Sequence, residues 1–325
     1  MEDAPTHQLP RVALSHGDFN GIGYEVMLKT FVDARMFEML TPILYGQSKA
    51  FAYYKKNFGM DSPNYALTRD VRQAGQGKFN IINIVENELK IEPGAASELS
   101  MEMSMVSMKK SVEDLRNGLV DALVMAPDSP AVEQSNLNYL FSHFKDAKPL
   151  RLMVNDMMRI ALATDDLPLE KALAKIDVPF LVDKMVTLSE ALKNDFGINA
   201  AKIAVMGLNP HVSAGDDDKV LNAVADAQRK GVMAFGPFTV SQLFVNGLWK
   251  KYDAVLSMYY DQGVFPLKLM TVGGCACYWA GLPVVCAAAM HGPAFDIVNT
   301  NQAVPDSYRK AVYLARDIAS RRIEQ

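Results

Sequence analysis

The sequence lacks a long apolar run and has no excess of either charge. It has 33 Lys and Arg residues against 37 Asp and Glu residues in 325, for a formal net charge of -4. This balance gives no strong positive field, so we expect no nucleic-acid partner. No apolar run reaches the roughly 18 residues that a membrane helix needs. Residues 1–10 are polar and have no signal-peptide core. We therefore expect a cytoplasmic protein without a membrane partner.

Cysteine is also scarce, and the three cysteines, Cys275, Cys277 and Cys286, lie close together. An odd number in a chain without a signal segment favours free thiols over a disulfide framework. One alternative is a thiolate metal site completed by His291, although structural zinc sites usually place closer cysteine pairs on turns. The other is a set of small buried thiols, which we favour.

Hydrophobic residues make up 50% of the chain, enough to bury a large core. Short apolar runs bounded by Gly, Pro or Asp alternate with segments of helical periodicity, a pattern typical of strands buried on both faces of a parallel sheet. The sequence therefore predicts an α/β fold with largely parallel sheets. Helices are expected at residues 97–117, 179–196 and 307–321, with Gly197 ending the second. Strands are expected at residues 11–14, 42–45, 79–85, 121–125, 160–163, 202–206, 253–258 and 283–289.

Residues 16–26, His-Gly-Asp-Phe-Asn-Gly-Ile-Gly-Tyr-Glu-Val, follow the first expected strand and open an amphipathic helix. Gly, Asp and Asn at such a turn let backbone N–H groups face a ligand at the positive end of the helix. The alternative is a tight turn that needs glycine for its own geometry. Both interpretations stay open at this point.

The most informative segment is residues 252–263, an apolar run that ends in Asp261-Gln262-Gly263. Open α/β sheets bind ligands at the carboxyl ends of their strands, so we expect a buried strand followed by a polar loop that faces a ligand. Pro266-Leu267-Lys268 and residues 291–297, His-Gly-Pro-Ala-Phe-Asp-Ile, come next. The expected chemistry thus lies in the last quarter of the chain.

These segments, with residues 206–211 (Met-Gly-Leu-Asn-Pro-His), resemble the 4-hydroxythreonine-4-phosphate dehydrogenase family. The resemblance runs from Arg11 to about Arg321. It implies NAD- and metal-dependent oxidative decarboxylation in pyridoxal phosphate biosynthesis. It also implies a two-domain α/β/α fold like that of the isocitrate and isopropylmalate dehydrogenases. The first domain would comprise residues 7–130 plus 284–325 and the second residues 131–283, with a cleft between them. Family members are homodimers, so a homodimer is expected here.

By this resemblance, Asp166, His211 and Tyr260 occupy the positions of the family's three metal-binding histidines. Asp166 and His211 could hold a divalent ion such as Zn²⁺, Mg²⁺ or Mn²⁺. Tyr260 is a poor ligand while its phenol is neutral, and Asp261 could take its place if the loop turns differently. The alternative is a solvated acidic loop and a packed tyrosine. The resemblance also assigns catalytic roles to Lys268 and Asp261.

The resemblance implies NAD binding by residues 291–297, through His291, Gly292, Ala294 and Asp296. The family continues this segment with Ala-Gly-Lys-Gly, whereas this chain has Val-Asn-Thr-Asn at residues 298–301. Asp296 could instead simply cap the following turn.

Other positions that hold the family's substrate are changed: Pro130 replaces a lysine, Cys277 an asparagine and Cys286 an arginine. A thiol cannot replace a guanidinium in binding a phosphorylated, carboxylated substrate. We therefore expect an NAD-dependent dehydrogenase with an altered, less anionic substrate. The alternative is a non-catalytic homologue that serves as a binding or scaffold protein, for which an active relative is one candidate partner.

Overall fold

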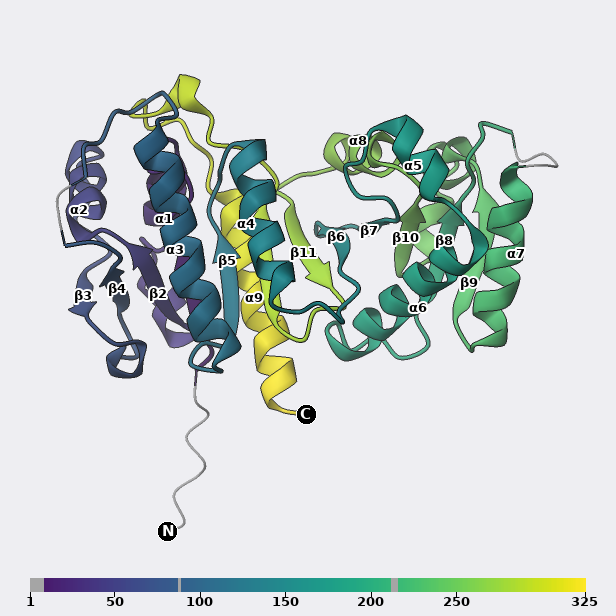
Figure 1. Cartoon of the computed structure of the whole chain (residues 1–325), viewed down its shortest axis with the longest axis horizontal. Helices are drawn as coiled ribbons and strands as arrows, with labels where there is room; N and C mark the ends of the chain where they lie inside the picture. Colours follow the sequence, from purple (N-terminus) through teal and green to yellow (C-terminus); the bar gives the residue numbers. More distant parts are fainter. Residues whose placement is uncertain (1–8, 87–88, 212–215) are drawn as a thin grey trace, which may run out of the picture. The chain divides into compact units, whose positions relative to one another are not determined.

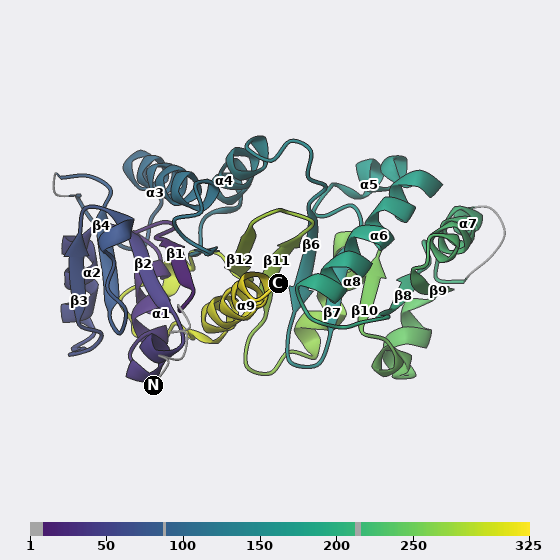
Figure 2. The same ribbon diagram turned by 90° about the horizontal axis from the view of Figure 1, so that it is seen from below.

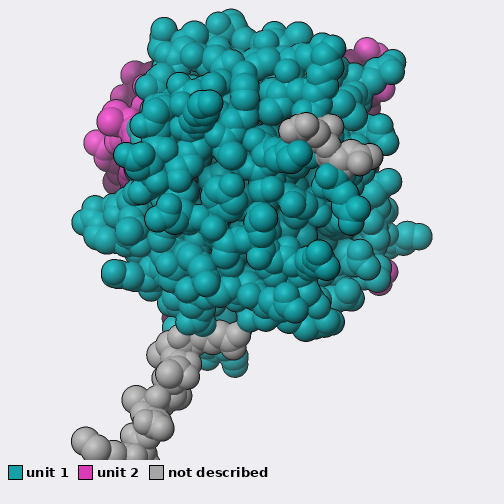
Figure 3. All heavy atoms as spheres, turned by 90° about the vertical axis from the view of Figure 1, so that its left-hand side faces the viewer, with its two compact units in different colours: residues 1–145, 284–325 teal, residues 146–283 magenta. Residues whose placement is uncertain are grey.

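The computed structural model describes residues 9–86, 89–211 and 216–325. It divides the chain into two compact units, shown as ribbons in Figure 1 and as coloured spheres in Figure 3. Unit 1 comprises Met1–Lys145 and Val284–Gln325, and unit 2 comprises Asp146–Pro283. Each unit is a sheet with helices, and most strand pairs are parallel. The predicted α/β fold with largely parallel sheets is confirmed.

The sheet of unit 1 has the strand order β3-β4-β2-β1-β5-β12, and each neighbouring pair is parallel. The central strands β1, β2 and β5 are buried along almost all of their length because nearly every side chain in them is apolar. The strands are β1 (Arg11–Ser15), β2 (Thr41–Gly46), β3 (Tyr65–Thr68), β4 (Phe79–Asn83), β5 (Ala122–Met125) and β12 (Val285–Ala289).

The helices of unit 1 cover both faces of this sheet, with α3 and α4 on one face and α1 and α9 on the other (Figure 2). Ser97 starts α3 with a capping box, in which its side chain accepts from the backbone of Ser100 and the Ser100 hydroxyl accepts in return. The helices are α1 (Gly23–Thr30), α2 (Ser48–Asn57), α3 (Glu98–Arg116), α4 (Pro130–Ser142) and α9 (Asp306–Ile323), with short η1 (Ala34–Glu38), η2 (Val71–Gln73) and η5 (Phe295–Ile297).

The sheet of unit 2 has the strand order β11-β6-β7-β10-β8-β9. Strand β6 is antiparallel to both of its neighbours, and the pairs from β7 to β9 are parallel. The strands are β6 (Leu150–Val154), β7 (Arg159–Leu162), β8 (Lys202–Met206), β9 (Met233–Phe238), β10 (Ala254–Ser257) and β11 (Ala276–Ala280).

In unit 2, α6 contacts β6 and β11, α7 contacts β9, and α8 contacts β7 and β10. Asp177 caps the start of α6, and Gly197, with a φ of 69°, follows its end as predicted. The helices are α5 (Leu169–Lys175), α6 (Val178–Asn194), α7 (Asp216–Arg229) and α8 (Tyr260–Leu269), with short η3 (Ser241–Val245) and η4 (Leu248–Lys251).

Two expectations from the sequence bear on the core and on membranes. All three cysteines are buried thiols, as favoured above. Across residues 9–86, 89–211 and 216–325, no helix is both long enough and apolar enough to cross a bilayer.

Candidate functional site

The predicted metal-binding positions follow three neighbouring parallel strands of unit 2, in the spatial order β7, β10, β8. Asp166 comes after β7, Tyr260 after β10 and His211 after β8. The carboxyl ends of parallel strands lie at one edge of a sheet, so the fold brings these three segments to the same edge. Asp166 and His211 are exposed, and Tyr260 is half-buried at the start of α8.

Hydrogen bonds tie the three strand ends together. The Thr164 hydroxyl donates to the Met258 carbonyl at 2.8 Å, which joins the loop after β7 to the end of β10. The Gln262 side chain accepts from the Met258 N–H and donates to the Gly207 carbonyl, both at 2.7 Å. Gln262 therefore links β10 to the loop after β8. The sequence showed this residue only as part of a polar triplet, although its amide can serve two backbone groups at once.

The prediction of a polar loop at Asp261-Gln262-Gly263 is wrong, because these residues form the first turn of α8. The helix packs closely on the sheet: a Cβ at Gly263 would lie 2.5 Å from Ser257 Oγ and 2.9 Å from Ile160 Cγ2. Packing against β7 and β10 therefore overrides the weak helix propensity of Gly263 and of Pro266 within the helix.

The predicted catalytic residues Asp261 and Lys268 both lie on α8 and are both exposed. Lys268 follows Asp261 by about two helical turns, so the two residues share one face but stand about 10 Å apart along the axis. They do not form a direct carboxylate–ammonium pair, and any joint action would require a substrate that spans two helical turns.

Arg151 of β6 sits beside the two acidic residues that follow β7. Its guanidinium Nε lies 2.6 Å from Asp165 Oδ1, and its Nη2 lies 3.8 Å from Asp166 Oδ2. Burial raises the pKa of Asp165, Arg151 opposes this rise, and Asp166 adds to it. Asp165 adopts the left-handed backbone region, with a φ of 56°, and turns the chain after β7. The sequence analysis missed Arg151, whose only signal was a charge inside an otherwise apolar run.

His211 belongs to a loop that is fixed by buried Asp217 near the start of α7. The Asp217 carboxylate accepts from the Leu208 N–H at 2.8 Å and from the Asn209 side-chain amide at 3.1 Å. The loop therefore presents the exposed imidazole from a defined backbone.

The donor set at this edge is incomplete for a metal held by one chain. Asp166 and His211 offer a carboxylate and an imidazole, both of which divalent ions accept. However, the described part of the chain contains no group of three His, Cys, Asp or Glu side chains that could hold a metal ion. The Arg151 guanidinium beside Asp166 also competes with a metal ion for the negative charge of the Asp166 carboxylate. We therefore assign no reaction step to a metal.

In unit 1, the turn after β1 packs directly against the loops that follow β5 and β12. A Cβ on Gly17 would lie 2.3 Å from the Pro127 carbonyl oxygen, and one on Gly21 would lie 2.6 Å from Pro293 Cβ. The Asp18 N–H donates to the Pro127 carbonyl, and the Ile22 N–H donates to the Pro293 carbonyl at 2.9 Å. These N–H groups are used within the protein. For the Asp18 and Ile22 N–H groups, the interpretation that residues 16–26 face a ligand is wrong. The tight-turn interpretation accounts for Gly17 and Gly21.

A buried polar cluster lies under this turn. Ser104 donates to Asp128 Oδ2 at 2.6 Å and Asn136 donates to it at 3.1 Å, while Ser100 donates to Asp18 Oδ2 at 3.0 Å. Burial raises the pKa of Asp128 well above its ordinary value, and the nearby Asp18 carboxylate adds to the rise. The cluster therefore favours a neutral Asp128.

The predicted cofactor residues His291, Gly292, Ala294 and Asp296 lie at the carboxyl end of β12. Gly292 and Asp296 are exposed, and His291 and Ala294 are half-buried. Among the residues that the structure describes, none hydrogen-bonds the Asp296 carboxylate, so the alternative that it caps the next turn has no support. Its carboxylate is available to a ligand.

The two asparagines of this loop adopt backbone conformations that usually require glycine. Asn299 has a φ of 62° and Asn301 a φ of 60°. Among residues with a side chain, Asn is one of the few that adopts this region readily. By the resemblance described above, these two asparagines take the positions of the glycines in the family's Gly-Lys-Gly. Their positive φ values are of the kind that glycine adopts.

Comparison with known proteins identifies the family of this chain. Residues 38–315 match the model of the family described as pyridoxal phosphate biosynthetic protein PdxA. The chain belongs to the PdxA family. It is similar to a 4-hydroxythreonine-4-phosphate dehydrogenase of Bacteroides thetaiotaomicron, with 32% identity over 95% of this chain and 88% of the relative.

Two further relatives of the family differ in what they support. A Clostridium botulinum protein, provisionally named a D-threonate 4-phosphate dehydrogenase, is 30% identical over 94% of this chain and 96% of its own length. A crystal structure of a 4-hydroxythreonine-4-phosphate dehydrogenase from Klebsiella pneumoniae has a TM-score of 0.80, covering 97% of this chain and 99% of that one. Because that enzyme is only 23% identical, it supports the PdxA fold alone.

Proposed function

We propose that this protein is an NAD-dependent dehydrogenase that oxidises a small hydroxy acid related to the phosphorylated substrates named for its relatives. What supports this most is the loop of residues 291–301, which keeps a glycine-like backbone at Asn299 and Asn301 and leaves the Asp296 carboxylate exposed. An exposed carboxylate on such a loop suits the hydroxyl groups of a nucleotide ribose.

The proposed substrate differs from those of the relatives in charge. By the resemblance, Cys277 and Cys286 take the positions of an asparagine and an arginine that hold the family's substrate. Both cysteines are buried in strands. A buried thiol offers no forked cationic donor for a phosphate or carboxylate. We therefore propose a less anionic substrate, with Lys268 and Asp261 on the exposed face of α8 as its polar contacts.

Calorimetric titration of the purified protein with NAD tests this proposal. We expect measurable binding, and we expect Asp296→Asn to weaken it about tenfold, the loss of one charge-assisted hydrogen bond. Asp61→Asn, an exposed aspartate of the same unit, is the matched control and should bind as the parent does. Absence of NAD binding by the parent protein would overturn the proposal.

A second candidate is a non-catalytic homologue that acts as a binding or scaffold protein. The Arg151 guanidinium, 3.8 Å from Asp166, favours this candidate. Its positive charge already pairs with the carboxylate that would otherwise serve as a metal ligand. Metal analysis after equilibration with Mn²⁺, combined with the NAD titration, separates the two. Binding of neither supports the scaffold, whereas NAD binding with turnover of a hydroxy acid supports the dehydrogenase.

A further inference from the structure

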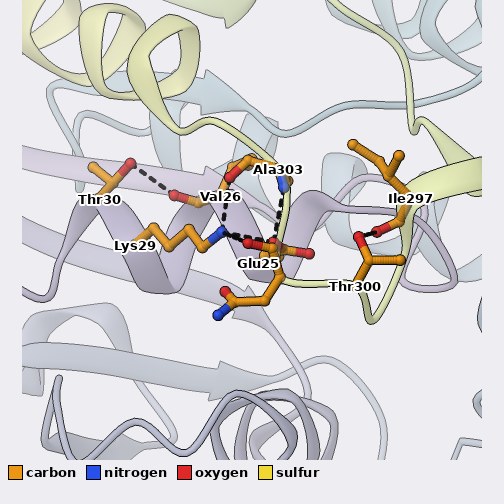
Figure 4. Close-up of polar contacts among 8 residues, drawn as sticks. Glu25, Val26, Lys29, Thr30, Ile297, Thr300 and Ala303 are labelled. Carbon is orange, nitrogen blue, oxygen red and sulfur yellow. Dashed lines mark hydrogen bonds and ion pairs between the residues drawn. The ribbon is translucent and has the colours of Figure 1, made fainter.

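Lys29 of α1 binds the segment that follows the proposed cofactor loop. Its ammonium group donates to Glu25 Oε1, to the Asn301 carbonyl and to the Ala303 carbonyl, each at 2.8 Å (Figure 4). An ammonium carries three protons, so these bonds use its full donor capacity. Lys29 thus connects α1 to two points of one loop.

Glu25 completes the arrangement from the same helix. Its Oε1 also accepts from the Ala303 N–H at 3.0 Å, so Ala303 is held through both its N–H and its carbonyl group (Figure 4). The Glu25 side chain is 1% exposed and that of Lys29 is 21% exposed. Because a buried carboxylate needs a partner, the Lys29 charge holds Glu25 in place as well as the loop.

The loop is therefore anchored to α1 at both ends. Near its start, the Ile22 N–H that precedes α1 donates to the Pro293 carbonyl at 2.9 Å. At its end, Glu25 and Lys29 hold Asn301 and Ala303. Ala294 and Asp296, two of the residues proposed to contact NAD, lie between these anchors.

The backbone between the anchors has a conformational cost that the anchors offset. Ala294, Asn299 and Asn301 all have positive φ values, 42°, 62° and 60°. Asn adopts this region readily, whereas Ala adopts it only when surrounding contacts hold it there. The conformation at Ala294 therefore depends on the contacts of the loop with α1, which begin at the neighbouring Pro293 carbonyl.

We infer that Glu25 and Lys29 are positioning residues for cofactor binding, which set the conformation of residues 293–303. The inference rests on the proposed NAD-dependent function. The two residues act through the backbone of Asn301 and Ala303.

Lys29→Met tests the inference, because it removes the three donors and keeps an unbranched side chain as far as the Cε position. We expect NAD affinity to fall about tenfold or more, since misplacement of binding groups by about 1 Å can cost up to 100-fold. Lys55→Met is the matched control, because Lys55 also donates from a helix of unit 1 to a backbone carbonyl, that of Pro63 at 3.0 Å. It should leave NAD affinity unchanged.

A second variant guards against simple unfolding. Lys29→Met leaves a buried carboxylate without its partner, so Glu25→Gln with Lys29→Met removes both charges together. Hydrogen exchange at the Ala303 amide is measured in each variant under conditions where the protein is folded. We expect faster exchange there together with weaker NAD binding, and Lys29→Arg should recover only part of both because its planar fork cannot reach the same three acceptors.

The outcomes separate the inference from the proposed function. If the parent protein binds no NAD, the proposed function fails and the positioning role fails with it. If the parent binds NAD and the folded double variant exchanges faster at Ala303 but binds NAD equally well, the proposed function stands and the positioning role is overturned. Weaker binding with an unchanged kcat, seen as a raised KM for NAD, supports the inference.

Discussion

His16 is fully buried behind the turn that follows β1, with its ring stacked on that of Tyr24 at a centroid distance of 6.1 Å. Burial lowers the pKa of His16 to about 4, against the opposing effect of nearby backbone groups. The folded protein therefore holds this imidazole neutral at a pH where an unfolded chain would protonate it.

This depressed pKa predicts a loss of stability in mild acid. The folded value is below the unfolded one, so the contribution is intact above pH 6.5 and is lost as the pH falls toward 4. A shift of this size corresponds to about 3 kcal/mol in the free energy of unfolding. Urea denaturation between pH 7 and pH 4.5 measures it. His16→Leu should flatten the pH dependence, whereas His143→Gln should not, and an unchanged slope in His16→Leu would contradict the assignment.

The raised pKa of Asp128 predicts the opposite dependence of stability on pH. Its folded pKa is raised, so the stability that comes from the neutral carboxyl is present below the unfolded value of 3.8 and is lost as the pH rises through the folded pKa. Asp128→Asn keeps a neutral group of the same shape and should remove this loss. We expect the variant to gain stability relative to the parent between pH 6 and pH 8 in urea denaturation. Asp121→Asn, outside the cluster, serves as the control for the substitution itself.

At the residue scale the sequence indicated which types of residue matter but not how they are paired. Asp166 was predicted as a metal ligand, and its neighbour Arg151, on the preceding antiparallel strand β6, was not foreseen. Lys29 and Ala303 meet across 274 positions, a separation that local periodicity does not encode. Contacts of this kind depend on the tertiary fold.

At the scale of elements, Gln262 is the side chain that links the ends of two neighbouring strands of unit 2, β10 and β8. Gln262→Leu should remove both bonds and leave the Met258 N–H and the Gly207 carbonyl unpaired. We expect a loss of about 2 to 3 kcal/mol in the free energy of unfolding. Gln134→Leu, on the exposed surface of α4, should cost far less in the same denaturation experiment. Equal effects of the two substitutions would argue against the linking role.

The sequence predicted the buried central strands well because their apolar runs are unbroken. Four strands escaped it for physical reasons: β3 and β9 are half-exposed at sheet edges, β6 carries Arg151, and β11 is built largely from Ala, Cys and aromatic residues. Helix α8 was also missed, since its Gly263 and Pro266 disfavour helices in isolation. In each case tertiary packing decided the structure.

At the scale of the whole molecule, we propose a homodimer formed through Phe265 and Leu269 of α8 and the residues that follow the helix, with Asp261 and Lys268 at the edge of this interface and open to the substrate. Phe265 and Leu269 are 64% and 70% exposed and share one side of the helix, and Val272 is 84% exposed. Large apolar side chains grouped in this way suit an interface.

Light scattering should therefore give about twice the chain mass of 35.8 kDa. Phe265→Glu with Leu269→Glu should shift the protein to the monomer, because two carboxylates would be buried without partners. Leu67→Glu places the same charge at an exposed leucine of β3 and should leave the mass unchanged. A monomeric parent protein would refute the dimer.

The discontinuity of unit 1 has a consequence for biosynthesis. Strand β5 pairs with β12, and α9 packs on both, yet β12 and α9 are translated after every strand of unit 2. While the chain emerges from the ribosome, the middle of the sequence has all its partners available before the beginning does. Unit 2 is thus expected to become protease-resistant first, while the N-terminal part of unit 1 still lacks β12 and α9.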